Sequence, residues 1–185
     1  MTTFSTALAP DRRLTLLGCV GFIAILAAAS QVAIPIPGTP VPITLQPMVV
    51  VLAGMMLGPI AGATSMLLYL AIGAAGVPVF APVGAPGVAR FFGPTGGYLL
   101  AYPVAAYIAG ALAQRMPSLA GRWLSALLGI AALFVGGLTQ LTLLTGNLSG
   151  AIAFGLTPFA LLDVVKAFLA ALIARPQRPP RSALS

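Results

Sequence analysis

Long apolar runs, separated by short segments rich in proline, glycine or arginine, make up most of this 185-residue chain. A helix that crosses a lipid bilayer needs roughly 20 consecutive residues that are mostly apolar. The pattern predicts six such helices, over residues 14–34, 43–57, 60–77, 95–114, 123–145 and 158–174. The prolines and glycines of segments 35–42 and 78–94 argue against a helix in either. We therefore predict an all-α membrane protein with two long irregular connections.

Two threonines stand where helices are expected to begin. Thr157 is followed by Pro158, which fits an N-cap with proline at the first helical position. Thr95 fits an N-cap of the fourth helix. Residues 146–156 show no clear pattern, so we assign them to no element.

The composition supports a chain that lies almost wholly in the membrane. Hydrophobic residues make up 59% of it and charged residues only 6%, whereas a soluble domain carries about 25% charged residues. Arg12 and Arg13 before an apolar run would also suit a signal peptide, but the run is long enough to span. We predict an N-terminal tail over residues 1–13, one six-helix domain over residues 14–174 and a basic C-terminal tail over residues 175–185.

The arginines predict the orientation of the chain. With six spans, one side of the membrane receives Arg12, Arg13, Arg115, Arg122, Arg175, Arg178 and Arg181. The other side receives only Arg90, and five or seven spans would scatter these residues over both sides. Because basic residues favour the cytoplasmic side, we predict a multi-pass protein of the bacterial cytoplasmic (inner) membrane with both termini in the cytoplasm. The net charge of +7 is thus explained by topology and does not indicate a nucleic-acid partner.

Missing residue types argue against an enzyme. The chain has no histidine, no glutamate and one cysteine, Cys19, so a metal site or ordinary acid–base catalysis is not expected. The phosphate-binding pattern Gly-x-x-x-x-Gly-Lys-Ser/Thr is also missing. We predict no catalytic residue, no metal and no cofactor. The chain is not expected to hydrolyse ATP itself, so any energy coupling must come from partners or from ion gradients.

Asp163 and Lys166 are the clearest functional candidates. Lys166 is the only lysine and Asp163 is one of two acidic residues, yet both lie in the sixth apolar run, about two turns after its expected start. A charge at the bilayer centre costs about 3 kcal/mol on insertion scales. Positions i and i+3 share one face of a helix, so the two side chains can meet. A ligand site explains them, and so does a structural ion pair inside the bundle.

Arg90 and a few polar or aromatic residues extend this candidate site. Arg90 is the only basic residue predicted on the outer side, and with Lys166 it suits an anionic small molecule. Gln46, Tyr69 and Tyr98 are further candidates for contacts with a small molecule. Each has a plainer explanation. Arg90 can extend toward lipid headgroups, Gln46 can bond another helix, and the tyrosines can simply pack.

The first helix carries a face of small residues. Ala24 and Ala28 are four positions apart, so a second helix can approach closely there. The second helix can belong to a partner subunit or to the same bundle.

Five blocks along the chain together resemble one family of membrane proteins. They are Val41-Pro-Ile-Thr-Leu-Gln46, Gly58-Pro59, Leu68-Tyr-Leu-Ala-Ile-Gly-Ala-Ala-Gly-Val-Pro-Val-Phe80, Phe92-Gly-Pro-Thr-Gly-Gly-Tyr98 and Asp163-Val-Val-Lys166. In this order they resemble the BioY family, the biotin-binding S components of energy-coupling-factor (ECF) vitamin transporters. The resemblance covers the chain from the first helix to the last.

The resemblance implies a fold, a ligand and partners. It implies a six-helix S-component bundle with an outward-facing biotin pocket. It also implies an ECF transmembrane coupling subunit, contacted through Ala24 and Ala28, and a pair of ATPase subunits. We expect biotin to be captured from outside under segment 78–94 and released inward after the bundle reorients in the lipid bilayer.

The resemblance also implies roles for the candidate residues. The biotin carboxylate would seek Arg90 or Lys166, and the ureido N–H groups would meet Asp163. The ureido carbonyl would meet Lys166 or Gln46. The apolar parts of biotin would pack against the side chains of Tyr69, Phe80 and Tyr98.

Three other functions remain open at this stage. The chain can be an S component for another small anionic vitamin. It can be a passive channel or facilitator that forms a homo-oligomer. It can also be a purely structural subunit.

Overall fold

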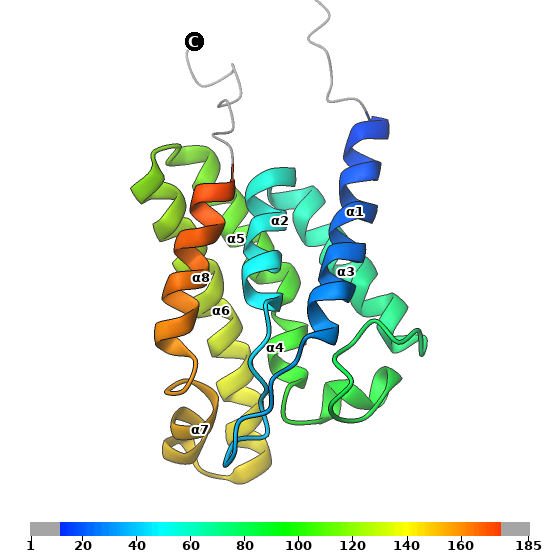
Figure 1. Cartoon of the computed structure of the whole chain (residues 1–185), viewed down its shortest axis with the longest axis vertical. Helices are drawn as coiled ribbons and strands as arrows, with labels where there is room; N and C mark the ends of the chain where they lie inside the picture. The colour runs from blue at the N-terminus through cyan, green and yellow to red at the C-terminus, as the bar shows by residue number, and fades with distance from the viewer. Residues whose placement is uncertain (1–11, 175–185) are drawn as a thin grey trace, which may run out of the picture.

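The chain forms a bundle of helices in the computed structural model, which describes residues 12–174 (Figure 1). The elements are α1 (Arg12–Gln31), α2 (Gln46–Leu57), α3 (Pro59–Ala74), the 3-10 helix η1 (Gly87–Phe92), α4 (Gly96–Leu100), α5 (Tyr102–Arg115), α6 (Leu119–Thr145), α7 (Leu148–Gly155) and α8 (Ala160–Ile173). The described part contains no strand, only an isolated bridge between Ile34 and Ile43. The predicted all-α fold is therefore confirmed, while both predicted tails lie outside the described residues except for Arg12 and Arg13.

The helices match the apolar runs closely, but the number of membrane crossings stays a prediction. By length and composition, α1 and α6 can each cross a membrane, and α7 with α8 form a third candidate bent by 52°. Helices α2 and α3 are apolar but shorter. The fourth run is divided at Ala101 into α4 and α5.

Of the two expected helix starts, the one at Thr157 is wrong, whereas Thr95 is the N-cap residue of α4. Helix α8 begins at Ala160 with Phe159 as its N-cap, and the Thr157 hydroxyl instead donates to the carbonyl of Ile152 at 3.2 Å. Asp163 consequently lies in the first turn of α8 rather than two turns in, where its negative charge is favourable at a helix N-terminus. Thr95 does precede α4, but its side chain makes no capping hydrogen bond.

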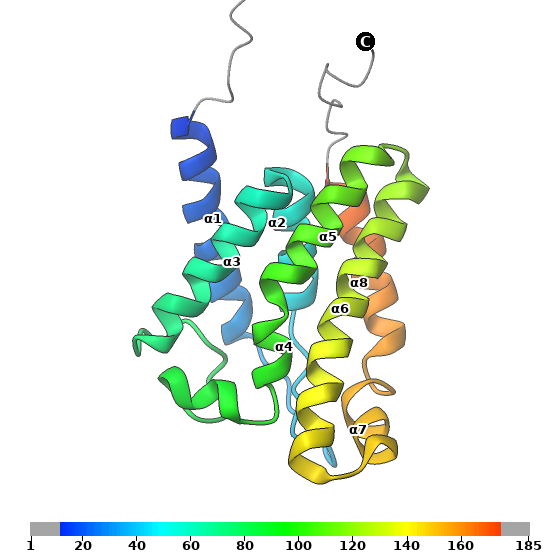
Figure 2. The same cartoon turned by 180° about the vertical axis from the view of Figure 1, so that it is seen from behind.

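Residues 146–156 contain a helix that the sequence pattern did not reveal. Gly146 ends α6 in a left-handed conformation with φ 67°, and the Asn147 side chain then accepts a hydrogen bond from the amide of Gly150. These two signals start α7, which runs beside the end of α6 (Figure 2).

Two halves of the bundle differ in how they pack (Figures 1 and 2). The terminal half is the end where α1 begins and α8 ends. Its core is made mainly of small residues, among them Ala109, Ala126 and Ala170, all fully buried. The loop half is the opposite end, where α7 and the connections 32–45 and 75–95 lie. Here the core contains the aromatic residues Tyr69 and Phe80.

Hydrogen bonds tie both connections of the loop half to neighbouring elements. The Thr39 hydroxyl donates to the carbonyl of Phe154 in α7 at 2.7 Å. At the end of α1, the Ser30 hydroxyl donates to the carbonyl of Val79 at 2.6 Å. The Gln31 side-chain amide donates to the carbonyl of Phe80 at 3.1 Å. Segment 78–94, expected to close over a ligand, is thus already anchored to α1.

Candidate ligand-binding site

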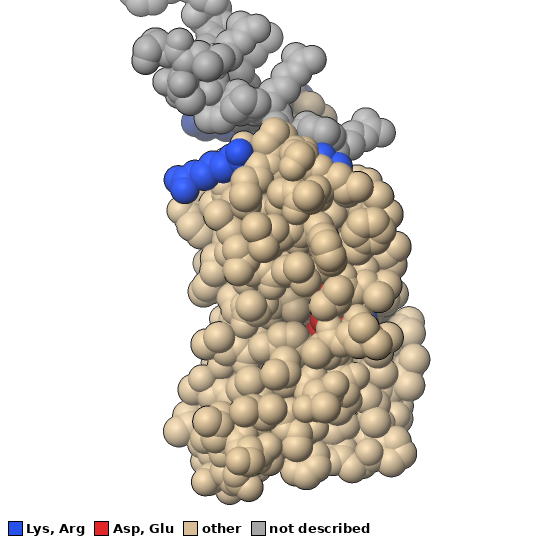
Figure 3. All heavy atoms as spheres, turned by 90° about the vertical axis from the view of Figure 1, so that its left-hand side faces the viewer, with Lys and Arg blue, Asp and Glu red and all other residues tan. Residues whose placement is uncertain are grey.

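A hollow in the loop half brings together six of the seven predicted ligand contacts. Residues from α2, η1, α4, α5, α6, α7, α8 and the connections between helices line it, and the predicted ones among them are Gln46, Phe80, Arg90, Tyr98, Asp163 and Lys166. About 730 Å³ of space in and at the mouth of the hollow is free of protein atoms. Figure 3 shows acidic atoms through a gap at mid-height of an otherwise uncharged face, with basic atoms gathered at the terminal end.

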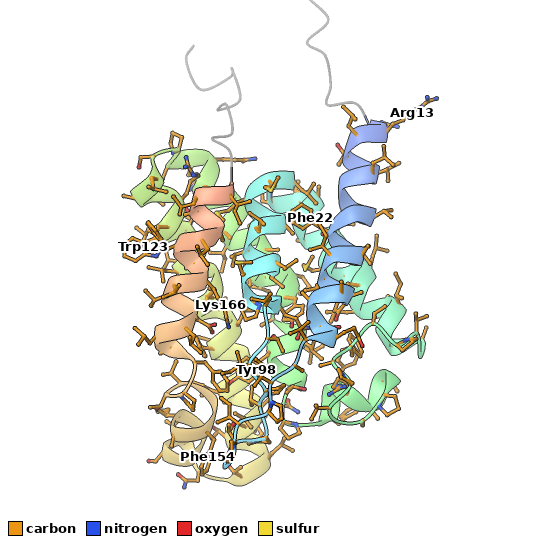
Figure 4. The ribbon with its side chains drawn as sticks, in the orientation of Figure 1. Arg13, Phe22, Tyr98, Trp123, Phe154 and Lys166 are labelled. Atoms are coloured by element: carbon orange, nitrogen blue, oxygen red, sulfur yellow. The ribbon has the colours of Figure 1, made fainter. Side chains whose placement is uncertain are left out.

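The Asp163–Lys166 ion pair forms one wall of this hollow. Lys166 Nζ donates to Asp163 Oδ1 at 2.7 Å, and both side chains are more than nine-tenths buried. Because they are three residues apart on α8, one helical turn brings them together. Figure 4 shows Lys166 between α8 and α2, with Tyr98 on its loop side. The pair thus offers a ligand a hydrogen-bond acceptor and a donor at one place.

Arg90 enters the same hollow from η1. Its guanidinium donates to the carbonyls of Ala81 and Val83, so it holds the preceding loop in place. These partners are neutral, and no acidic side chain pairs with Arg90 among residues 12–174. Burial lowers the pKa of the guanidinium, and the nearby hydroxyls of Tyr69 and Tyr102 oppose that shift. An arginine stays protonated at physiological pH, so the hollow contains a positive charge without a counter-ion.

Tyr69 lies behind the wall and does not line the hollow. Its side chain is fully buried, and its hydroxyl donates to the carbonyl of Val79 at 2.8 Å. The Gln46 amide donates to that hydroxyl at 3.3 Å. Tyr69 therefore positions Gln46 and the segment before Phe80, and the expectation that it contacts a ligand directly is not supported by its place.

Two aromatic side chains that line the hollow, Phe80 and Tyr98, each pack directly against a glycine. The Phe80 ring lies against Gly73 of α3, and the Tyr98 ring lies against Gly137 of α6, so close that an added methyl group would overlap either ring. The Tyr98 hydroxyl also donates to the carbonyl of Gly155 at 2.7 Å, which joins α4 to α7. Side chains at these glycine positions would push the rings toward the hollow.

Several lining residues were missed by the sequence reasoning. They are Thr44, Thr95, Tyr102, Phe134 and Phe159. Thr95 was assigned only a capping role, and Tyr102 is indistinguishable by pattern from other tyrosines of the fourth apolar run. The one available signal was its nearness to the Phe92–Tyr98 block.

Ala24 and Ala28, the predicted contacts with a partner subunit, do not line the hollow. Both are exposed on the surface of α1, whereas the next-door residues Phe22 and Leu26 are buried in the bundle. Among residues 12–174, nothing covers this small-residue face, so it takes no part in the packing of the described bundle.

Comparisons with known proteins agree on one family. The model of the BioY family matches residues 5–182. A probable biotin transporter BioY from Pyrococcus horikoshii is 39% identical over 153 residues, which is 83% of this chain and 89% of that protein. The biotin transporter BioY from Thermotoga maritima is 35% identical over the same shares of both chains.

A solved structure shares the fold. It is the crystal structure of the S-component for biotin from an ECF-type ABC transporter, with a TM-score of 0.83 and 29% sequence identity. The match covers 91% of this chain and 93% of that one.

Proposed function

Because the chain belongs to the BioY family, we propose that its hollow binds biotin and that it is the substrate-capture subunit of a vitamin uptake transporter. The observation that carries this proposal is one hollow that contains a buried ion pair and a buried, unneutralised arginine. Biotin offers two N–H donors, a carbonyl and a carboxylate, which match these groups. The subunit binds and carries its ligand and is not an enzyme.

Charge decides which end of biotin faces which residue. Asp163 can only accept hydrogen bonds when ionised, so it takes the ureido N–H groups and would repel the carboxylate. Lys166 and the Gln46 amide then donate to the ureido carbonyl. The carboxylate is directed to Arg90, whose planar guanidinium suits it. Phe80 and Tyr98 cover the apolar ring and chain.

The exposed face of α1 supports a docking role. We assign Ala24 and Ala28 to contact with an ECF transmembrane coupling subunit, which in turn binds the ATPase subunits. The exposure of both residues favours this over packing inside the bundle. The proposal includes six crossings, cytoplasmic termini in the bacterial inner membrane, and inward release after segment 78–94 has closed on the ligand.

Equilibrium binding of labelled biotin to the full chain in lipid nanodiscs tests this function. The variant should replace both members of the pair, Asp163→Asn with Lys166→Met, because a single replacement would leave a buried charge alone. We expect submicromolar binding by the wild type and a loss of at least about 100-fold in the variant, roughly the effect of two charge-assisted hydrogen bonds.

Two controls define failure. Excess unlabelled biotin should displace the label, whereas other small carboxylate vitamins should not; displacement by one of those would change the ligand. A variant that binds biotin as the wild type does would reduce the ion pair to a structural role.

A further inference from the structure

We infer that Tyr102 contacts the ligand directly and that its hydroxyl, together with Arg90, forms the subsite for the anionic group. This inference rests on the proposed function of the same hollow. It adds a residue that was neither among the predicted contacts nor in the motifs that resemble the family.

The Tyr102 ring is held in a fixed place. The residue begins α5, lines the hollow and is only 4% exposed. Its ring stacks on that of Tyr69, with centroids 6.2 Å apart and planes at 24°. Tyr69 is itself fixed by its hydrogen bond to Val79. A ring fixed in this way keeps its hydroxyl in one position, so little rotamer entropy is lost when a ligand binds.

The Tyr102 hydroxyl differs from those of its neighbours. Tyr69 and Tyr98 both donate to backbone carbonyls, at 2.8 and 2.7 Å. Within residues 12–174, no side chain or backbone group is bonded to the Tyr102 hydroxyl. Polar groups with little exposure almost always have a hydrogen-bond partner, and this hydroxyl is not among the fully enclosed unpartnered atoms of the described residues, so it is accessible from the hollow that Tyr102 lines. A polar atom of a ligand in the hollow is the natural partner.

Arg90 lines the same hollow, and one of its donors has no partner. Its two terminal nitrogens bond to Ala81 and Val83, but its buried Nε has no partner among the described residues. The guanidinium also lies within electrostatic range of the Tyr102 hydroxyl. A carboxylate has two oxygens and needs at least two donors, and the hydroxyl and the guanidinium together supply them. The subsite at Tyr102 and Arg90 therefore suits the carboxylate of biotin better than its ureido group.

The variant Tyr102→Phe removes only the hydroxyl and keeps the stacked ring. We expect biotin to bind about tenfold more weakly, the effect of one hydrogen bond to a charged group. Biotin methyl ester, which has no anionic group, should bind the variant and the wild type within about twofold of each other. The matched control is Tyr107→Phe, a tyrosine of the same helix that is 51% exposed; it should bind both ligands as the wild type does.

Two further measurements separate a contact from a structural role. Without ligand, Tyr102→Phe should unfold at the same temperature as the wild type or higher, because it removes an unpaired hydroxyl. In an Arg90→Gln background, the loss caused by Tyr102→Phe should shrink, since residues that share one partner are not additive.

The outcomes are distinguishable from those of the proposed function. If the wild type binds biotin and Tyr102→Phe binds it equally well, or if the ester is weakened as much as biotin, this inference is overturned and the proposed function stands. If the wild type does not bind biotin at all, both fall.

Discussion

The glycines that join α2, α3 and α5 in the terminal half pack against different atoms from the glycines behind the walls of the hollow in the loop half. In the terminal half, Gly54 of α2 lies against the backbone of Ala106, and Gly110 of α5 lies against the backbone of Gly54 and Pro59. In the loop half, Gly73 and Gly137, which back the walls of the hollow, lie against aromatic side chains instead, although Gly97 of α4 lies against the backbone of Gly136 in α6. Backbones of packed helices cannot move apart without moving the helices, whereas a side chain can rotate. The contact of α2 with α3 and α5 in the terminal half is therefore a rigid support, whereas the Phe80 and Tyr98 walls of the hollow in the loop half are adjustable.

The largest effect is expected where backbone meets backbone. The variant Gly54→Ala would place a methyl group on the carbonyl of Ala106. Neither α2 nor α5 can yield locally, so we expect a loss of about 3 kcal/mol or more in stability. Thermal unfolding in detergent measures it. Gly21→Ala is the control, because nothing lies within 4 Å of that position. Equal unfolding temperatures for the two variants would show that the contact between α2 and α5 at Gly54 can relax and is not rigid.

A smaller effect, on binding rather than stability, is expected at Gly137. An added methyl group in Gly137→Ala would overlap the Tyr98 ring and push it toward the hollow. We expect biotin affinity to fall about tenfold while the unfolding temperature changes little, as for modest overpacking that a side chain can relieve. In a Tyr98→Ala background the same substitution should have no further effect. A large loss of stability with unchanged affinity would contradict an adjustable wall.

The smallest effect is expected in the loop that Arg90 holds. Gly84 has φ +105°, and an added methyl group would meet Arg90 Nη1. Gly76 has a similar φ, +96°, but nothing lies within 4 Å of it. Both Gly84→Ala and Gly76→Ala therefore carry the strain of a left-handed residue, and only Gly84→Ala displaces the arginine. We expect Gly84→Ala to weaken biotin binding about threefold relative to Gly76→Ala. Equal affinities would mean that Arg90 does not depend on this loop.

Sequence patterns predict the helices well because each apolar run is closed by proline, glycine or arginine. Helix α7 escaped because it is short and its start depends on the conformation of Gly146 and the cap at Asn147, which hydropathy does not register. Thr157 was misplaced for a related reason, since a threonine before proline also occurs in the turn that precedes α8.

In the candidate site, too, some residues could be predicted from the sequence and others could not. Charges are so rare in this chain that Asp163, Lys166 and Arg90 could be identified without a structure, and all three line the hollow. Tyrosines could not be sorted in this way. A membrane helix is apolar on every face, so periodicity does not tell which side faces the hollow. Tyr69 was therefore placed in the site and Tyr102 was omitted, whereas the structure places Tyr69 behind the wall.

The count of ionised groups around the hollow has an electrical consequence. Arg90 and Lys166 are positive and Asp163 is negative, which leaves one positive charge in excess. A ligand with a single negative charge brings that sum to zero. The membrane potential acts with about 2.3 kcal/mol per elementary charge per 100 mV. The voltage across the membrane would then act on the empty carrier when this region moves, while the filled carrier would be nearly indifferent to it.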